Sequence, residues 1–309
     1  MLRPLILTWL LFGLSITAAQ RLYAYADPLD TVPRTAVISA FAPELERLLE
    51  GLDERRDFSA NGVAFATGTL EGQSVVLFLS GVSMTNAAMN TQLVLDRFDV
   101  RRILFSGIAG SLDPSLNIGD VVVAERWGNY LEGIYARETA TGEFVPPPFA
   151  EPSDRAGFGM FVPRDVNVVN AEHPQGERRF WFDADQTLLA EARRLPADLP
   201  LRCDAEQQCL SHPPRLVVGG SGVSGPVFMD NAEFRGYAHE AFGASVVDME
   251  SAAVAQVAWA NQVPFIAFRA VSDLAGGGEE ENEMGVFLNL AADSSAKAVR
   301  AFMAGLDRP

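Results

Sequence analysis

The 309-residue chain is poor in lysine and histidine and has more acidic than basic residues. It contains one lysine, Lys297, three histidines, and a formal net charge of −16. Because binding to a phosphate backbone needs a basic surface, this charge argues against DNA or RNA as a partner. His173, His212 and His239 show no metal-ligand or nucleophilic spacing. No serine lies in a G-x-S-x-G elbow, so the sequence gives no support for a serine hydrolase.

Cysteine is almost absent too, with Cys203 and Cys209 on either side of the stretch DAEQQ. This spacing suits a small disulfide loop in an oxidising compartment. A zinc site would need two more ligands nearby, and His212 is the only candidate. We therefore predict a disulfide between the two cysteines and no metal site.

Long apolar runs are also scarce, and the one at the N-terminus has the features of a targeting segment. Arg3 precedes the run Leu5–Ile16, and small residues follow it. The run is short for a membrane span. The pattern is typical of a signal peptide cleaved after Ala19 or Ala26, with a retained anchor as the alternative. We expect a periplasmic or secreted protein without stable membrane association after the segment is removed.

The remaining chain has the composition of a globular α/β protein, with 48% hydrophobic and 21% charged residues. Alternating strands and helices with one hairpin predict three layers, in which helices cover both faces of a mixed central sheet. We expect a single domain over residues 27–309 with a loop-rich insertion at about residues 131–214. Strands are predicted at 35–40, 63–70, 74–79, 102–105, 120–124, 215–219, 245–248 and 264–270, and helices at 43–52, 84–98, 231–242, 251–261 and 286–306.

Two carboxylates lie where apolar strands end, Glu250 in SVVDMESAA and Asp273 in FRAVSDLAG. A strand–helix–strand unit would bring both to the carboxyl ends of neighbouring strands, where open α/β sheets bind ligands. Each acid taken alone could equally be a helix cap or a turn residue. Arg269, inside the second apolar strand, is costly unless it is paired, which favours a place in a site.

The Met-Glu run at Met249 and the Arg-x-x-Ser-Asp run that begins at Arg269 together resemble the nucleoside phosphorylase and nucleosidase superfamily. The resemblance is closest to methylthioadenosine/S-adenosylhomocysteine nucleosidases and extends from Thr35 to Leu306, interrupted by the insertion. It implies a phosphorylase/hydrolase-like fold and hydrolysis of the N-glycosidic bond of a purine nucleoside, with a 5′-thio-substituted adenosine as the default substrate. It also implies no cofactor, and a homodimer in which the neighbouring subunit completes the 5′ pocket.

The resemblance implies roles for three catalytic residues. Asp273 would protonate N7 of the purine, which requires a carboxyl group that keeps a proton, as burial favours. Glu44, directly after the first predicted strand, would activate water, although alone it would be an ordinary acid in the first turn of a helix. Arg269 would orient the water or pair with a site carboxylate.

The remaining implied site residues bind the ribose and the base: Glu250, Met249, Ser272, Phe228, Met229, Ala109 and Gly110. Glu250 would accept hydrogen bonds from the ribose hydroxyls, with Met249 against the sugar. Phe228 would stack on the base, although a core phenylalanine is the alternative. The predicted turn SGIAG would let the backbone approach the base. Ile108 in this turn is a departure, because the close nucleosidases have a serine there.

Phosphorylases of the superfamily carry arginines in the first strand-to-helix loop and just before the central glycine-rich turn. Here the first loop, SAFAPE, has none, and Phe105 and Ser106 precede the central turn. Phosphate needs charge-matched donors, so their absence favours hydrolysis, although Gly81 and Ser83 could still bind an anion. A phosphorylase and a nucleoside-binding or storage protein without turnover remain the alternatives. The presence of all three acids argues against storage.

Gly220, Gly222 and Gly225 spell G-x-G-x-x-G after a predicted strand. A dinucleotide site needs a helix that begins at this loop. Pro226 follows instead, and the next predicted helix begins only at Asn231. The sequence therefore argues against a nicotinamide or flavin cofactor.

Overall fold

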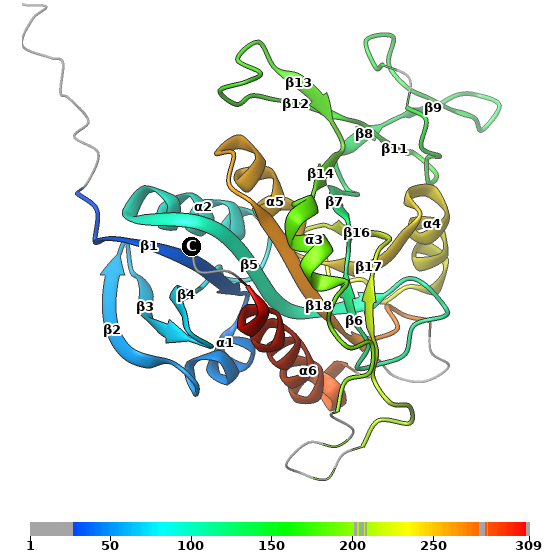
Figure 1. Cartoon of the computed structure of the whole chain (residues 1–309). Coiled ribbons are helices and arrows are strands. Elements are labelled where there is room, and N and C mark those ends of the chain that lie inside the picture. The colour runs from blue at the N-terminus through cyan, green and yellow to red at the C-terminus, as the bar shows by residue number, and fades with distance from the viewer. Residues whose placement is uncertain are drawn as a thin grey trace, which may run out of the picture.

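The computed structural model describes residues 27–151, 153–200, 203, 207, 209–277, 282 and 284–306. The predicted signal segment, residues 1–26, lies outside them, so export stays a prediction. In this part of the chain a 12-stranded mixed sheet has helices on both faces, which confirms the predicted fold class (Figure 1). No helix among these residues is both long and apolar enough to cross a membrane.

The described part of the chain contains six helices and twelve strands of the main sheet. The helices are α1 (Ala42–Leu49), α2 (Met84–Arg97), α3 (Gln186–Ala192), α4 (Ala232–Phe242), α5 (Ser251–Ala260) and α6 (Met284–Gly305). The strands are β1 (Asp30–Ser39), β2 (Asp53–Ala60), β3 (Val63–Leu70), β4 (Gln73–Leu79), β5 (Phe98–Ser111), β6 (Val121–Val123), β7 (Arg126–Asn129), β14 (Trp181–Asp183), β15 (Leu216–Val218), β16 (Ser221–Ser224), β17 (Ala244–Asp248) and β18 (Phe265–Asp273).

Both faces of the sheet are buried, which explains why its central strands read as continuous apolar runs. On β1, Ala36 and Ile38 face a cluster that includes α2 and α5. Val37, between them, faces the opposite cluster, which includes α1, α3 and α6. The successive side chains of a strand point to opposite faces, so this one run contributes to both halves of the core.

Strand β5 connects the two parts of the sheet, whose path runs β14-β7-β16-β17-β5-β1-β4-β3-β2. It pairs in parallel with β1 and β18, and near its end Gly110 and Ser111 pair antiparallel with β17. Strands β17 and β18 therefore both pair with β5 and not with each other, which corrects their prediction as neighbours. The strand ends that carry Glu250 and Asp273 still lie close together, because Gly110 of β5 pairs with both Val247 and Asp273.

The predicted turn at Ser106–Gly110 was wrong, because these residues continue β5. The segment finds hydrogen-bonding partners in β18, whose register with β5 extends from Phe265 opposite Ile103 to Asp273 opposite Gly110. Its glycines have a different use from the expected one. They remove side chains where β5 lies against the polar groups of neighbouring elements.

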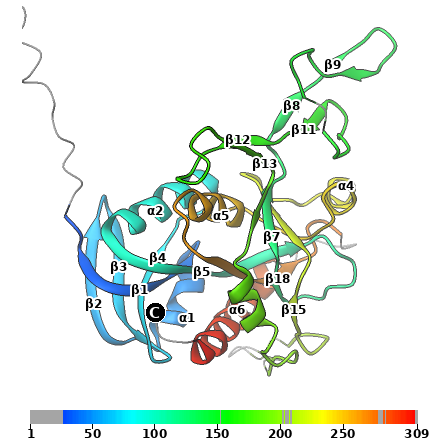
Figure 2. The same cartoon turned by 45° about the horizontal axis from the view of Figure 1, so that its top comes forward.

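The segment predicted as an insertion contains three small hairpins that project from the body (Figure 1, Figure 2). They pair β8 (Gly133–Tyr135) with β11 (Phe161–Pro163), β9 (Arg137–Glu138) with β10 (Phe144–Val145), and β12 (Val166–Val168) with β13 (Glu177–Arg179). The chain then returns to the body, where β14 pairs with β7 and α3 joins the core. Cys203 and Cys209 form the predicted disulfide.

The G-x-G-x-x-G glycines serve close packing. A Cβ on Gly222 would lie 2.4 Å from the Trp127 ring, and one on Gly225 would lie 2.7 Å from the Tyr130 ring. Gly220 has a φ of 73°, which favours glycine. The segment enters β16, and the next helix, α4, begins only at Ala232. The motif therefore lacks the helix N-terminus that a pyrophosphate would need.

Gly222→Ala is expected to lower the free energy of unfolding by about 1–3 kcal/mol, because the new methyl group overlaps the buried Trp127 ring. Urea denaturation of both proteins measures the change. Gly236→Ala is the matched control, since nothing lies within 4 Å of its Cβ position in α4, and a gain of up to about 1 kcal/mol is expected there. Equal stability of Gly222→Ala and the parent protein would contradict this account of the motif.

Candidate active site

A cavity of about 280 Å³ opens where β1, β5, β17 and β18 end. Its lining includes nearly all of the residues that the sequence predicted for the site: Glu44, Ala109, Gly110, Phe228, Met229, Met249, Glu250, Ser272 and Asp273. Arg269 lies behind this wall, fully buried. The structure thus brings together residues separated by more than two hundred positions in the chain. Prediction missed several other lining residues, above all Asp248 and the apolar Phe41, Val82 and Leu288.

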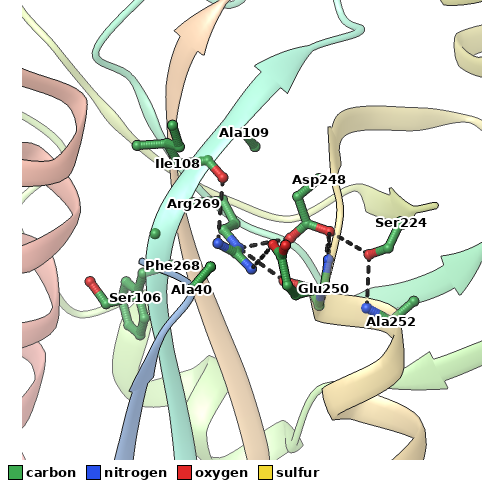
Figure 3. A network of polar contacts seen from close by, with 12 residues as sticks. Ala40, Ser106, Ile108, Ala109, Ser224, Asp248, Glu250, Ala252, Phe268 and Arg269 are labelled. Atoms are coloured by element: carbon green, nitrogen blue, oxygen red, sulfur yellow. Dashed lines mark hydrogen bonds and ion pairs between the residues drawn. The ribbon is translucent and has the colours of Figure 1, made fainter. Parts of the chain in front are cut away.

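The buried guanidinium of Arg269 is the centre of the site (Figure 3). Its Nε lies 2.8 Å from Asp248 Oδ2 and 2.9 Å from Ser251 Oγ. Its Nη2 lies 3.6 Å from Glu250 Oε2 and makes no hydrogen bond to the described residues. The ring of Phe105 lies 3.9 Å from the guanidinium carbon. The guanidinium is thus enclosed by its ion-pair partners and by an aromatic ring.

Asp248 was expected only as the end of a strand, and the structure makes it the main partner of Arg269. Its Oδ1 accepts hydrogen bonds from the hydroxyl of Ser224 and from the backbone N–H groups of Glu250 and Ser251. These donors satisfy one carboxylate oxygen and leave Oδ2 for the guanidinium. The sequence did contain a signal for this role, because Asp248 is an acid that ends an apolar strand two residues before Glu250.

Glu44 is buried at the start of α1 and accepts three backbone hydrogen bonds. Its Oε2 accepts from the N–H of Ala40 at 2.7 Å and of Phe41 at 3.3 Å, and its Oε1 accepts from the N–H of Ile108 at 2.8 Å. Burial raises the pKa of Glu44, against the opposing effects of Arg269 and these amides. A buried carboxylate with a raised pKa is suited to act as a general base. Glu46 on the same helix is exposed.

Gly107 on β5 makes room for this arrangement. A Cβ there would lie 2.0 Å from Arg269 Nη1 and 2.7 Å from Glu44 Oε1. Any larger residue would separate the arginine from the carboxylate. Gly107 was predicted to let the backbone approach a base. The structure shows instead that it makes room for Arg269 and Glu44.

Glu250 connects the network to the cavity. Its Oε1 accepts a hydrogen bond from the backbone N–H of Ser83 at 2.8 Å, at the N-terminus of α2. Burial raises the pKa of Glu250 to about 7, with Asp248 adding to the shift and Arg269 opposing it. One guanidinium thus faces three carboxylates, those of Glu44, Asp248 and Glu250.

Asp273 and Ser272 also line the cavity, and both are buried. The Ser272 hydroxyl donates to Asp273 Oδ2 at 2.9 Å, and the N–H of Ala275 donates to Oδ1 at 2.8 Å.

Phe228 is 52% exposed, so its ring is available to a ligand, whereas Met229 packs in a core cluster. The described residues contain no group of three or more His, Cys, Asp or Glu side chains placed to hold a metal ion.

Comparison with known proteins agrees with this geometry. Residues 34–304 match the family described as the phosphorylase superfamily. The 5′-methylthioadenosine/S-adenosylhomocysteine nucleosidase of Mycobacterium bovis is 31% identical over 85% of this chain and 94% of its own. The crystal structure of the nucleosidase of that name from Neisseria meningitidis, in complex with methylthio-immucillin-A, is 27% identical with a TM-score of 0.65 and covers 89% of this chain and 100% of its own. Futalosine hydrolase of Helicobacter pylori shares the fold, at 24% identity and a TM-score of 0.66 over 89% of this chain and 99% of its own.

The raised pKa of Glu250 predicts a pH-dependent contribution to stability. Between the ordinary carboxyl value of 4.5 and about 7, the folded protein holds a proton at Glu250 that the unfolded chain has lost. Stability from this group is therefore present at low pH and lost as the pH rises through about 7. Relative to the parent, Glu250→Gln should gain up to about 3 kcal/mol between about pH 5 and pH 8.

Urea denaturation of the parent and of Glu250→Gln at several pH values measures this difference. Glu46→Gln is the control, because its exposed side chain should give a difference that does not change with pH. A constant difference between Glu250→Gln and the parent would contradict the assignment.

Proposed function

The chain belongs to the phosphorylase superfamily, and from this premise we propose that it hydrolyses the N-glycosidic bond of a purine nucleoside, of the 5′-methylthioadenosine and S-adenosylhomocysteine class. The observation that carries the proposal is that three buried acids line one cavity. Glu44 and Glu250 interact with Arg269, whereas Asp273 accepts hydrogen bonds from Ser272 and Ala275. The relatives that are named as nucleosidases support the same activity.

These positions suit the charges that develop during the reaction. As the bond between C1′ and N9 breaks, its electrons move to the purine and positive charge develops on the ribose. Asp273 donates a proton to N7 of the departing base, and Glu44 accepts a proton from the water that attacks C1′. Glu250 accepts hydrogen bonds from the ribose hydroxyls, and Arg269 pairs with Glu250 and Asp248 from behind the cavity wall. The products are the free base and the ribose derivative.

Hydrolysis is favoured over phosphorolysis because protein carboxylates already occupy the donors that phosphate would need. The backbone N–H groups of Ala40, Phe41 and Ile108 bind Glu44, and that of Ser83 binds Glu250. Arg269 is paired with carboxylates. An incoming phosphate would meet negative charge with no free cation among the lining residues.

Four apolar residues support a thioether as the 5′ substituent. Phe41, Val82, Met284 and Leu288 line the cavity together with the residues predicted to bind the base and the ribose. Such a surface favours an alkylthio group over a phosphate. Ile108 also lines the cavity, so a base would find an apolar side chain where the close nucleosidases have a hydroxyl.

Purified mature protein is expected to release adenine from 5′-methylthioadenosine without phosphate, at a rate that added phosphate does not raise. Asp273→Asn should lower kcat at least about 100-fold, because the acid proton is lost. Glu44→Gln should lower kcat far more than it changes KM. Chromatographic measurement of free base tests all three.

Glu46→Gln is the matched control, since Glu46 is exposed on the same helix as Glu44 and should be neutral. Base release only in the presence of phosphate would establish a phosphorylase. Full activity of Asp273→Asn would contradict the assignment of Asp273 as the general acid. If the parent protein released no base, the proposed hydrolysis would be wrong and a nucleoside-binding role would remain.

We also propose that the protein is a homodimer. Two sets of large apolar side chains are exposed in the single chain. One, the arm, comprises Tyr135, Phe144, Val145, Phe149 and Met160 of the projecting hairpins; the other, the rim, comprises Val82, Met89, Val227 and Phe228. Exposed apolar clusters mark interfaces, and short isolated hairpins need packing partners. Resemblance to enzymes that complete their 5′ pocket from a second subunit supports the same assembly.

Met89→Asp is expected to shift the protein from dimer to monomer and to raise KM for 5′-methylthioadenosine. Met89 is 61% exposed on α2 and does not line the cavity, so the charge would act through the interface. Light scattering after size-exclusion chromatography measures the mass. Val169→Asp, at a 55% exposed position outside arm and rim, is the control. A monomeric parent would overturn the assembly and leave the proposed chemistry standing.

A further inference from the structure

Asn282, in the connection between β18 and α6, contacts two carboxylates at the base end of the cavity. Its side-chain Nδ2 lies 3.3 Å from Asp273 Oδ1 and 3.1 Å from Asp230 Oδ1. Its Oδ1 accepts a hydrogen bond from the backbone N–H of Met284, the first residue of α6, at 2.9 Å. Asp230 follows Met229, which lines the cavity, so this single carboxamide joins three segments around the site.

The orientation of the carboxamide follows from these partners. A backbone N–H can only donate, so the atom of Asn282 that faces Met284 must be the carbonyl oxygen. The NH₂ group then faces Asp230 and Asp273, which accept one N–H each. Asp230 thereby holds one N–H and leaves the other for Asp273.

These contacts make the two oxygens of Asp273 different. Oδ1 accepts from the N–H of Ala275 and from Asn282, so a proton placed there would displace a donor. Among the described residues Oδ2 has one partner, the Ser272 hydroxyl, which also lies 3.4 Å from the carbonyl oxygen of Ala109. When Oδ2 is protonated, this hydroxyl turns to that carbonyl, so its hydrogen bond is replaced and not lost.

We propose that Asn282 is a positioning residue for the general acid, which keeps Oδ1 of Asp273 as an acceptor and so places the transferable proton on Oδ2, with Asp230 holding Asn282 in place. The inference rests on the proposed hydrolysis. The proton leaves Oδ2 for N7 of the purine as the bond between C1′ and N9 breaks. The negative charge left on Asp273 is then stabilised by the N–H of Ala275, the Ser272 hydroxyl and Asn282.

Asn282→Ser separates this role from a structural one. Serine can still accept from the N–H of Met284 at the start of α6, as asparagine does, but it cannot reach two carboxylates. Asn282→Ser should lower kcat for 5′-methylthioadenosine about 10- to 100-fold, the range for losing a hydrogen bond to a charged group, with little change in KM. Asp230→Ala should produce a smaller loss of the same kind, because the Asn282 carboxamide is then held by fewer contacts.

A substrate whose leaving group needs no proton provides the second readout. p-Nitrophenyl β-D-riboside releases a stable phenolate, so its hydrolysis should be nearly unchanged in Asn282→Ser. Asp273→Asn in the same assay calibrates the result, because a variant without the acid should also retain this activity. Thermal unfolding of the variants checks that α6 and the fold are intact.

Selective loss on the purine nucleoside supports the positioning role. Unchanged kcat in Asn282→Ser, or an equal loss on both substrates, would overturn it while leaving the proposed function in place. Failure of the parent protein to release any base would instead overturn the proposed function, and the positioning role with it.

Discussion

The ion-pair network around the buried Arg269 guanidinium is the constraint on which the site depends. A fully buried arginine is tolerated only when carboxylates and hydrogen bonds compensate for its lost hydration. Here Asp248 and Glu250 from the end of β17 and Glu44 from α1 surround one cation delivered by β18. The loop ends of three separate elements are thereby held together. Removal of the cation would leave mutually repelling carboxylates in a dry interior.

The same network explains features that have no obvious role in the sequence. Gly107 is required because a side chain there would occupy the position of the guanidinium. Phe105 lies under the cation as a flat apolar support. The carboxylates of Asp248 and Glu44 add to the effect of burial on the pKa of Glu250, whereas Arg269 lowers this pKa. The raised pKa values of Glu44 and Glu250 thus come from burial, against the opposing effect of the cation that they share.

The sequence predicted the fold class and most elements because apolar periodicity and turn residues report burial directly. The strand at Ser106–Gly110 was missed because its glycines are typical of turns, and only the partners on β18 and β17 make the segment a strand. Strand β16 was missed for a similar reason, since Gly220 and Gly222 serve packing against Trp127 and Ser245. In both places contacts between distant segments outweigh local preference.

By itself the sequence predicted the residues of the candidate site: Glu250, Arg269 and Asp273 stand out because charged groups in or at the ends of apolar strands are costly without a use, and the family resemblance added Glu44. Only the tertiary structure brought Glu44, Glu250 and Asp273 to the lining of one cavity, with Arg269 buried behind it. It also revealed Asp248 as a partner of Arg269 and Asn282 as a partner of Asp273. Asn282 lies in an acidic, glycine-rich stretch with no periodicity, so nothing local marks it. Its significance comes from two carboxylates, one of them more than fifty positions away in the chain, that folding places within hydrogen-bonding distance.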